Sequence, residues 1–213
     1  MIPRLCVAES ARRGDPWNES VRRGRAEAQP SREAGRRAEA EVGTCNQRGF
    51  IVCLPPMPTW YFAYGSNMCG AIFRERRGMR PLETRVAWLD GHRLCFDIPV
   101  GPGTRGVANL TVDSGTRVCG VAYLLDEAQL ELLDRSEGVH VGVYRRVDVE
   151  LRVGGDGRLA AFTYQSTMTT TGRLPSPRYM GLLLDGAVEH GLPDEYQHYL
   201  RSFELAVDER NTG

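Results

Sequence analysis

The sequence lacks lysine altogether. All 27 of its basic residues are arginine, and 27 acidic residues balance them, so the formal net charge is zero. A balanced charge argues against a nucleic-acid partner and against binding to an anionic membrane. We attribute the absence of lysine to a coding bias and draw no conclusion about binding from it.

Cysteine motifs and long hydrophobic runs are missing as well. None of the six cysteines forms a C-x-x-C pair or stands with a histidine at zinc-ligand spacing, so the sequence predicts no metal site. No apolar stretch approaches the roughly 20 residues that cross a bilayer, and no hydrophobic signal core follows the first basic residues. We therefore expect a cytoplasmic protein with free thiols.

The first 56 residues differ in composition from the rest of the chain. Arginine pairs are set among Glu, Ala, Ser and Gly, with no sustained helical or strand periodicity. The acidic residues argue against a mitochondrial targeting peptide. Two interpretations stay open, a disordered extension and a translation start at Met57. In both, we expect residues 57–205 to fold as one domain without residues 1–56, followed by a flexible tail over residues 206–213.

The first half of the expected domain contains mainly strand signals. A short apolar strand over residues 60–64 precedes a helix over residues 66–77, which Gly78 ends. Asp90-Gly91 predicts a tight hairpin because this dipeptide suits positive φ angles. The hairpin joins strands over residues 86–89 and 93–98. Two further strands are expected over residues 107–112 and 118–125.

The second half mixes helices and strands. Residues 126–136 form an amphipathic helix that Asp126 can cap, and strands over residues 144–153 and 159–166 flank a glycine-rich turn. Two helices follow, over residues 177–190 and 193–202. Because short helices interrupt many strands without regular βαβ alternation, we predict an α+β fold with a mixed sheet or small barrel.

A strand that ends in a glycine turn and opens a helix is the first candidate site. It comprises Tyr61, Phe62, Ala63, Tyr64, Gly65, Ser66 and Asn67. Free backbone N–H groups at such a turn converge on one point and can bind an anion. Any strand-to-helix turn also favours Gly, Ser and Asn, so the motif alone indicates a site without naming its ligand.

Glu137, at the exit of the expected helix over residues 126–136, is the candidate proton carrier. A glutamate near a helix end is usually solvated. The alternative is burial beside the neighbouring apolar residues, which suits a carboxyl group to take and return a proton near neutral pH. Tyr144 and Tyr179 are candidates for lining a pocket, although either could be a core residue with a satisfied hydroxyl.

Nucleophilic catalysis finds little support in the sequence. No G-x-S-x-G turn surrounds Ser66, and none of the four histidines lies in a recognisable partner motif. Cys69 lies near a helix start, which can activate a thiol, but it has no assigned base.

Five segments match a known pattern in order and spacing. They are Tyr61-Phe62-Ala63-Tyr64-Gly65-Ser66-Asn67-Met68, Leu133-Asp134-Arg135-Ser136-Glu137-Gly138-Val139, Gly142-Val143-Tyr144, Pro175-Ser176-Pro177-Arg178-Tyr179 and Gly191-Leu192-Pro193-Asp194-Glu195-Tyr196. Together they resemble the γ-glutamylcyclotransferase family over about residues 59–203. Several motifs in the same order indicate a family far more specifically than any single motif does.

The resemblance implies a small mixed β-barrel with peripheral helices and a substrate loop from Tyr61 to Asn67. It implies that Glu137 is the acid/base and that Tyr144 and Tyr179 help to hold a γ-glutamyl group. The implied reaction releases 5-oxoproline and a free amine from a small γ-glutamyl substrate without a cofactor, and a homodimer stays open.

The loop sequence also bears on the substrate. Relatives acting on γ-glutamylamines more often have a Tyr-Gly-Thr-Leu loop, and the glutathione-specific branch has Gly-Tyr-Gly-Ser-Leu. Ala-Tyr-Gly-Ser-Asn favours γ-glutamyl amino acids. The small residues of Met68-Cys69-Gly70-Ala71 depart from the vertebrate pattern. A γ-glutamyl amine, peptide or biosynthetic intermediate therefore remains an alternative substrate, and a non-catalytic binding module is the alternative from another class.

Overall fold

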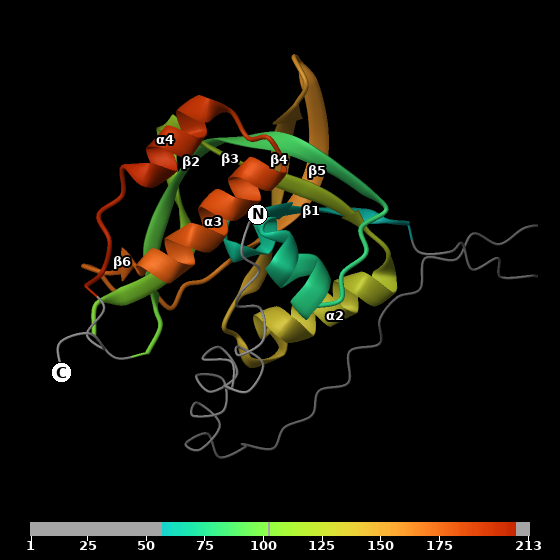
Figure 1. Ribbon diagram of the computed structural model, residues 1–213. Helices are drawn as coiled ribbons and strands as arrows, with labels where there is room; N and C mark the ends of the chain where they lie inside the picture. Colours follow the sequence, from blue (N-terminus) through green and yellow to red (C-terminus); the bar gives the residue numbers. More distant parts are fainter. Residues whose placement is uncertain (1–56, 102, 208–213) are drawn as a thin grey trace, which may run out of the picture. The chain divides into compact units, whose positions relative to one another are not determined.

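The computed structural model describes residues 57–101 and 103–207, which all belong to one compact unit (Figure 1). The expectations for residues 1–56 and for residues 208–213 of the tail lie outside the described residues. The strands are β1 (Thr59–Ala63), β2 (Glu83–Pro99), β3 (Arg105–Leu125), β4 (Arg145–Val153), β5 (Gly157–Gln165) and β6 (Leu174–Pro175). The helical elements are η2 (Ser66–Met68), η3 (Ala71–Arg76), α2 (Glu127–Glu137), η4 (Val139–Val141), α3 (Pro177–Glu189) and α4 (Asp194–Arg201).

Five strands close into a barrel. The sheet order is β1-β5-β4-β2-β3-β6, and a further antiparallel pairing of β1 with β3 closes the ring. The pairing of β1 with β5 is parallel and so is that of β3 with β6, whereas the other pairings are antiparallel. These pairings confirm the predicted α+β fold with a small mixed barrel. Because the ring is closed, β1 pairs with β3 on one side and with β5 on the other, and it is held from both sides.

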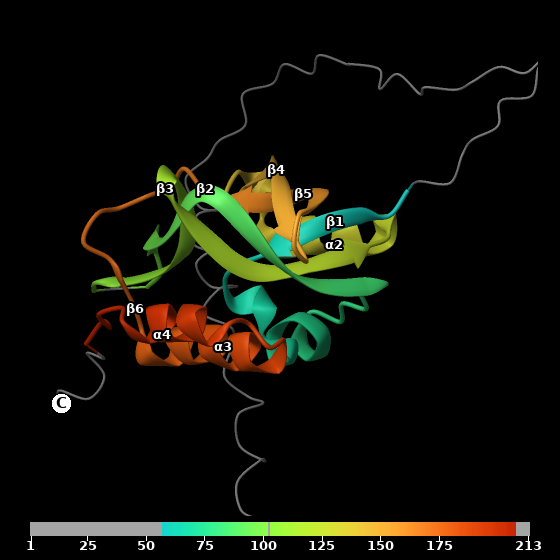
Figure 2. The same ribbon diagram turned by 90° about the horizontal axis from the view of Figure 1, so that it is seen from above.

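Several elements with local signals lie where the sequence predicts them. The side chain of Asp126 accepts a hydrogen bond from the backbone of Gln129 at 2.9 Å, and Gly138 ends α2 with a φ of 69°. The β4–β5 hairpin and the helices α3 and α4 are also confirmed. Figure 2 shows α3 and α4 side by side along the barrel.

The predicted hairpin at Asp90-Gly91 is wrong. Gly91 does have a positive φ of 72°, but β2 runs through it as one strand. Asp90 pairs with Arg117 and His92 with Val112, so a single β2 residue faces the four residues 113–116 of β3. The dipeptide therefore forms part of a β-bulge, and a glycine with positive φ is common in bulges as well as in turns. The two strands expected over residues 107–112 and 118–125 are likewise one strand, β3.

The predicted helix over residues 66–77 is also wrong, although Gly78 ends the segment as expected with a φ of 72°. A 3-10 turn over Ser66–Met68 is followed by Cys69 in an extended conformation and then by the π-helical turn Ala71–Arg76. The hydroxyl of Tyr123 donates to the carbonyl of Asn67 at 3.3 Å, which competes with helical pairing. Asn67 precedes this break and is buried, with its side chain directed to Tyr61 of β1.

Helix α3 packs directly on this broken segment. A Cβ atom on Gly186 would lie 2.6 Å from the carbonyl carbon of Met68 and 2.7 Å from the nitrogen of Cys69, so only glycine permits the approach. The Glu189 carboxylate accepts a hydrogen bond from the Gly70 nitrogen at 2.8 Å, and a Cβ on Gly70 would collide with that carboxylate. The small residue at position 70 thus makes room for a contact with α3.

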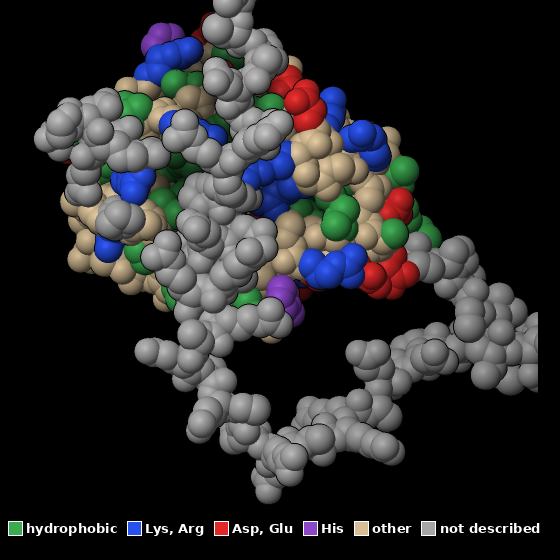
Figure 3. All heavy atoms as spheres, turned by 60° about the horizontal axis from the view of Figure 1, so that its bottom comes forward, with side chains coloured by type: hydrophobic (Ala, Val, Ile, Leu, Met, Phe, Trp, Pro, Cys, Tyr) green, Lys and Arg blue, Asp and Glu red, His purple; other side chains and the backbone are tan. Residues whose placement is uncertain are grey.

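Surface charges are mixed in the described part of the chain. Figure 3 shows arginine side chains spread over one face of the molecule rather than gathered in a single patch. Within residues 57–101 and 103–207, no helix is both long enough and apolar enough to cross a membrane.

The packing of α3 predicts different effects for two glycines on the same helix. Gly186→Ala should lower the free energy of unfolding by about 1–3 kcal/mol, because the added methyl group meets backbone atoms that cannot move aside. Gly181→Ala is the matched control, since a Cβ at Gly181 meets nothing within 4 Å. It should be neutral or stabilising by about 0.5–1 kcal/mol. Denaturant unfolding of both variants measures the difference, and equal destabilisation would contradict the packing described here.

Candidate active site

Three side chains from distant parts of the sequence meet where β1, η2 and the end of α2 come together. Asn67 Nδ2 donates to the hydroxyl oxygen of Tyr61 at 2.8 Å and to Glu137 Oε1 at 2.9 Å. Tyr61 lies in the middle of β1, Asn67 follows in η2 and Glu137 is the last residue of α2. The Asn67 side-chain oxygen is buried and has no hydrogen-bond partner among the described residues. Donation to the carboxylate therefore sets the orientation of this amide.

Glu137 has a second contact on the same oxygen. Arg77 Nη1 lies 3.0 Å from Glu137 Oε1, with 9% of the glutamate side chain and 19% of the arginine side chain exposed. Arg77 also donates to the hydroxyl of Ser136, which itself donates to the carbonyl of Leu133 at 2.8 Å. Both contacts of Glu137 thus use Oε1. Among the described residues, no hydrogen bond occupies Oε2, so that oxygen is free to exchange a proton with a ligand.

Tyrosine hydroxyls surround this carboxylate. Burial, reinforced by the charge of Glu137, raises the pKa of Tyr61 and that of Tyr144 well above the ordinary value. Burial also raises the pKa of Tyr64, whose hydroxyl donates to the carbonyl of Tyr164 at 2.6 Å. All three phenols stay protonated at neutral pH, so none of them can act as a base. The hydroxyls of Tyr61 and Tyr144 can donate to a ligand, whereas the proton of Tyr64 is already donated to Tyr164.

Tyr179 approaches the glycine turn from α3. Burial raises the pKa of Tyr179 to about 12, against the opposing effect of hydrogen bonds from the backbone of Ala108 and Ser66. The Ala108 nitrogen donates to the Tyr179 oxygen at 3.2 Å. A Cβ on Gly65 would lie 3.1 Å from that same oxygen, so the glycine lets the hydroxyl approach the turn. Because the Tyr179 oxygen accepts, its own proton remains available to a ligand.

A second carboxylate nearby is fully engaged. Asp134 binds Arg146 through two hydrogen bonds of 2.8 and 2.7 Å, and it accepts a third from the Tyr164 hydroxyl at 2.6 Å. The guanidinium of Arg146 also lies over the ring of Phe162, 4.5 Å from its centre. Both oxygens of Asp134 therefore have donors. This network supports the end of α2 and leaves Glu137 as the carboxylate that can take a proton.

Two further residues of the expected loop lie in the core, whereas Ser66 is partly exposed. Phe62 and Ala63 are fully buried. Their positions explain why residue 120 on β3 is a glycine, because a Cβ there would lie 2.3 Å from the Ala63 carbonyl oxygen and 2.9 Å from the Phe62 ring. Cys69 is buried beside α3. None of these three residues makes a hydrogen bond to Glu137 in the described structure.

Sequence reasoning missed Arg77 and the pair of Asp134 and Arg146 as neighbours of the site. Arg77 belongs to the run Arg74-Glu75-Arg76-Arg77, which looks like a solvated helix face. Only the broken helix brings its side chain to Glu137. Asp134 was recognised as part of a motif, but nothing in its local sequence indicates a partner on β4.

Neither a metal-binding cluster nor the groove found elsewhere on the described surface adds a residue to the site around Glu137. Among the described residues, no group of three or more His, Cys, Asp or Glu side chains could hold a metal ion. A shallow groove lies over β4 and β5, and none of the residues hydrogen-bonded to Glu137 lines it. The groove is lined by Thr59, Arg146, Asp148, Val149, Glu150, Ala160, Ala161 and Phe162.

The fold and the site together define a class: a small closed barrel that carries one available carboxylate among protonated tyrosines. Residues 117–200 match the AIG2-like family. The chain is 33% identical to the γ-glutamylcyclotransferase of Bos taurus over 148 residues, which cover 68% of this chain and 78% of the bovine protein. It is 37% identical to the γ-glutamyl cyclotransferase gliK of Claviceps purpurea, over 62% of this chain and 64% of that protein.

A solved structure agrees with these relatives. The structure of a γ-glutamyl cyclotransferase superposes with a TM-score of 0.61 at 31% identity, covering 73% of this chain and 92% of that chain. The chain belongs to the γ-glutamylcyclotransferase family.

The hydrogen bonds of Asn67 generate a prediction about activity. Asn67→Leu keeps a side chain of similar size but removes the donor to both Tyr61 and Glu137, so the carboxylate loses one of the two contacts that hold Oε1. We expect turnover of a γ-glutamyl amino acid to fall by about 10- to 100-fold, the scale typical of a misplaced catalytic group. Release of 5-oxoproline, normalised to the folded fraction from thermal unfolding, measures the effect. Unchanged turnover in a folded variant would show that Asn67 does not position the carboxylate.

Proposed function

We propose that this protein is an enzyme that cyclises γ-glutamyl amino acids to 5-oxoproline and a free amino acid, with Glu137 as the acid/base. One observation carries the assignment of the acid/base. Asn67 and Arg77 hold Glu137 Oε1, whereas Oε2 has no hydrogen-bond partner among the described residues. The family membership supports the reaction, and the geometry supports the residue.

The reaction is intramolecular. The α-nitrogen of the substrate attacks its own γ-carbonyl carbon, forming the C–N bond of a five-membered lactam, and the C–N bond to the departing amine breaks. At neutral pH the α-nitrogen begins as an ammonium, so it must lose two protons, and the departing nitrogen must gain two. Glu137 takes a proton from the first nitrogen and returns it to the second, and it repeats the transfer for the second proton.

Negative charge develops on the γ-carbonyl oxygen while the tetrahedral intermediate exists. Donors that are already in place stabilise such charge without reorganising. The protonated hydroxyls of Tyr144 and Tyr179 and the backbone at Gly65 are the candidates for this role. The same groups could bind the substrate α-carboxylate, and an anion in either position complements N–H and O–H donors.

Substrate shape supplies much of the rate. The nucleophile and the carbonyl belong to one molecule, so holding the substrate in a folded conformation makes the attack efficient. Because the substrate supplies its own nucleophile and no atom changes oxidation state, the reaction needs neither an activated water nor a redox cofactor. Tyr61, Tyr144 and Tyr179 present buried ring surface on which the γ-glutamyl chain can fold.

A non-catalytic binding module would not need an unoccupied carboxylate oxygen beside an ion pair. Burying a carboxylate is costly, and a site that only binds an ammonium group could use a solvated acid. The partly buried Glu137, held by two donors on one oxygen, favours proton transfer over binding alone.

The assignment predicts a large effect of Glu137→Gln. Glutamine keeps the shape of the side chain but cannot accept a proton, so turnover should fall by about 10²-fold or more while substrate binding largely survives. The control is Glu131→Gln on the same helix, because the Glu131 side chain is 64% exposed and, among the described residues, pairs only with Arg135 at the surface. Its turnover should stay within about twofold of the unmodified enzyme.

The measurement is 5-oxoproline release from a γ-glutamyl amino acid, with circular dichroism to establish that each variant is folded. Near-normal turnover in folded Glu137→Gln protein would remove Glu137 from the mechanism. An unmodified protein that releases no 5-oxoproline from any γ-glutamyl compound would instead support the binding module.

A further inference from the structure

We infer that Arg77 forms a binding site for the α-carboxylate of the departing amino acid, and that this site makes the enzyme prefer γ-glutamyl amino acids over γ-glutamyl compounds whose departing amine lacks that carboxylate. This inference rests on the proposed function and assigns a specificity-determining residue to it. Arg77 stands at the end of η3 and is absent from every motif that carries the family resemblance.

Distance makes the assignment feasible. Glu137 must come within about 3 Å of the departing nitrogen to return a proton to it. In an α-amino acid, the carboxyl carbon lies only about 2.5 Å from that nitrogen, because a single carbon separates them. Arg77 Nη1 is 3.0 Å from Glu137 Oε1. A substrate in contact with Glu137 therefore brings its carboxylate within reach of the guanidinium.

The guanidinium of Arg77 has N–H donors that are not used by its neighbours. Its contacts with Glu137 and Ser136 both use Nη1, so Nε and Nη2 make no hydrogen bond to another described residue. Its positive charge lowers the pKa of Tyr61 and of Tyr144 against the larger effect of burial, so it acts on the hydroxyls that line the site. With 19% of the side chain exposed, Arg77 is accessible to a small anion.

Charge balance gives the carboxylate a role during the reaction. Before proton transfer, Arg77 and Glu137 neutralise each other. When Glu137 takes the proton from the α-nitrogen it becomes neutral, and a partly buried guanidinium then lacks a counterion, which costs free energy. The carboxylate of the departing amino acid supplies that counterion. Its contact with Arg77 thus strengthens as the reaction proceeds, and interactions of this kind accelerate the chemical step.

The test compares two substrates that differ only in that group, γ-glutamyl-alanine and γ-glutamyl-alaninamide. The unmodified enzyme should prefer the alanine compound by about tenfold or more in kcat/KM, because the carboxamide leaves Arg77 without a counterion. Arg77→Gln should reduce the preference to about threefold or less, chiefly by slowing the alanine compound. Arg77→Lys, which keeps the charge but not the planar fork, should give an intermediate preference and serves if the glutamine variant does not fold.

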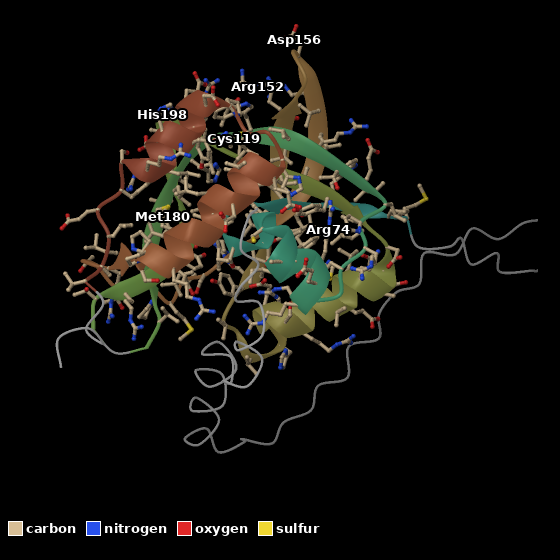
Figure 4. The ribbon with its side chains drawn as sticks, in the orientation of Figure 1. Arg74, Cys119, Arg152, Asp156, Met180 and His198 are labelled. Carbon is tan, nitrogen blue, oxygen red and sulfur yellow. The ribbon has the colours of Figure 1, made fainter. Side chains whose placement is uncertain are left out.

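Arg74→Gln is the matched control. Arg74, labelled in Figure 4, lies in η3 three residues before Arg77 and is exposed, and its replacement changes the net charge by the same amount. The preference should persist in this variant, whereas general electrostatic attraction would make it fall as in Arg77→Gln. If Arg77 served only to position Glu137, Arg77→Gln would slow both substrates by the same factor and leave their ratio unchanged, which would overturn the inference.

The same two substrates distinguish a failure of the role of Arg77 from a failure of the proposed function. An unmodified enzyme that releases 5-oxoproline equally well from both compounds would overturn the role of Arg77 and leave the proposed function intact. Release from neither compound, nor from any other γ-glutamyl compound, would overturn the proposed function and this inference together.

Discussion

The structure depends on keeping one carboxylate, that of Glu137, partly buried and yet available to a ligand. A buried carboxylate needs donors, yet an acid/base needs an oxygen that no donor occupies. The protein meets both needs by directing Asn67 and Arg77 to the same oxygen of Glu137. The surrounding tyrosines stay protonated, so they add donors without competing for the proton.

Much of the architecture serves this arrangement. Strand β1 is held by β3 and β5, and Tyr61 in the middle of β1 pairs with Tyr123 on one side and Phe162 on the other, so its place is fixed. Helix α3 packs without a side chain at Gly186 onto the backbone of Met68 and Cys69, and this contact fixes Asn67. The bidentate pair of Asp134 and Arg146 connects α2 to β4, and α2 ends at Glu137. Three separate supports therefore converge on one cluster.

The sequence predicts elements whose signals are local. Helix α2 has its cap at Asp126 and its end at Gly138, and both signals lie within the segment they describe. The hairpin expected at Asp90-Gly91 failed because a glycine with positive φ suits a bulge as well as a turn, and the length of β3 opposite it decides between them. The helix expected from residue 66 failed because α3, more than 100 residues away, determines its path. Arg77 could not be recognised for the same reason, since its role depends on that break.

The central claim concerns which oxygen of Glu137 faces the reacting nitrogen, and a crystal structure of the unmodified protein with 5-oxoproline bound tests it most directly. The lactam nitrogen of 5-oxoproline, which is the former α-nitrogen of the substrate, should lie about 3 Å from Glu137 Oε2, with Asn67 and Arg77 still on Oε1. A product bound in the groove over β4 and β5, or a lactam nitrogen well beyond hydrogen-bond distance of Glu137 Oε2, would contradict the claim.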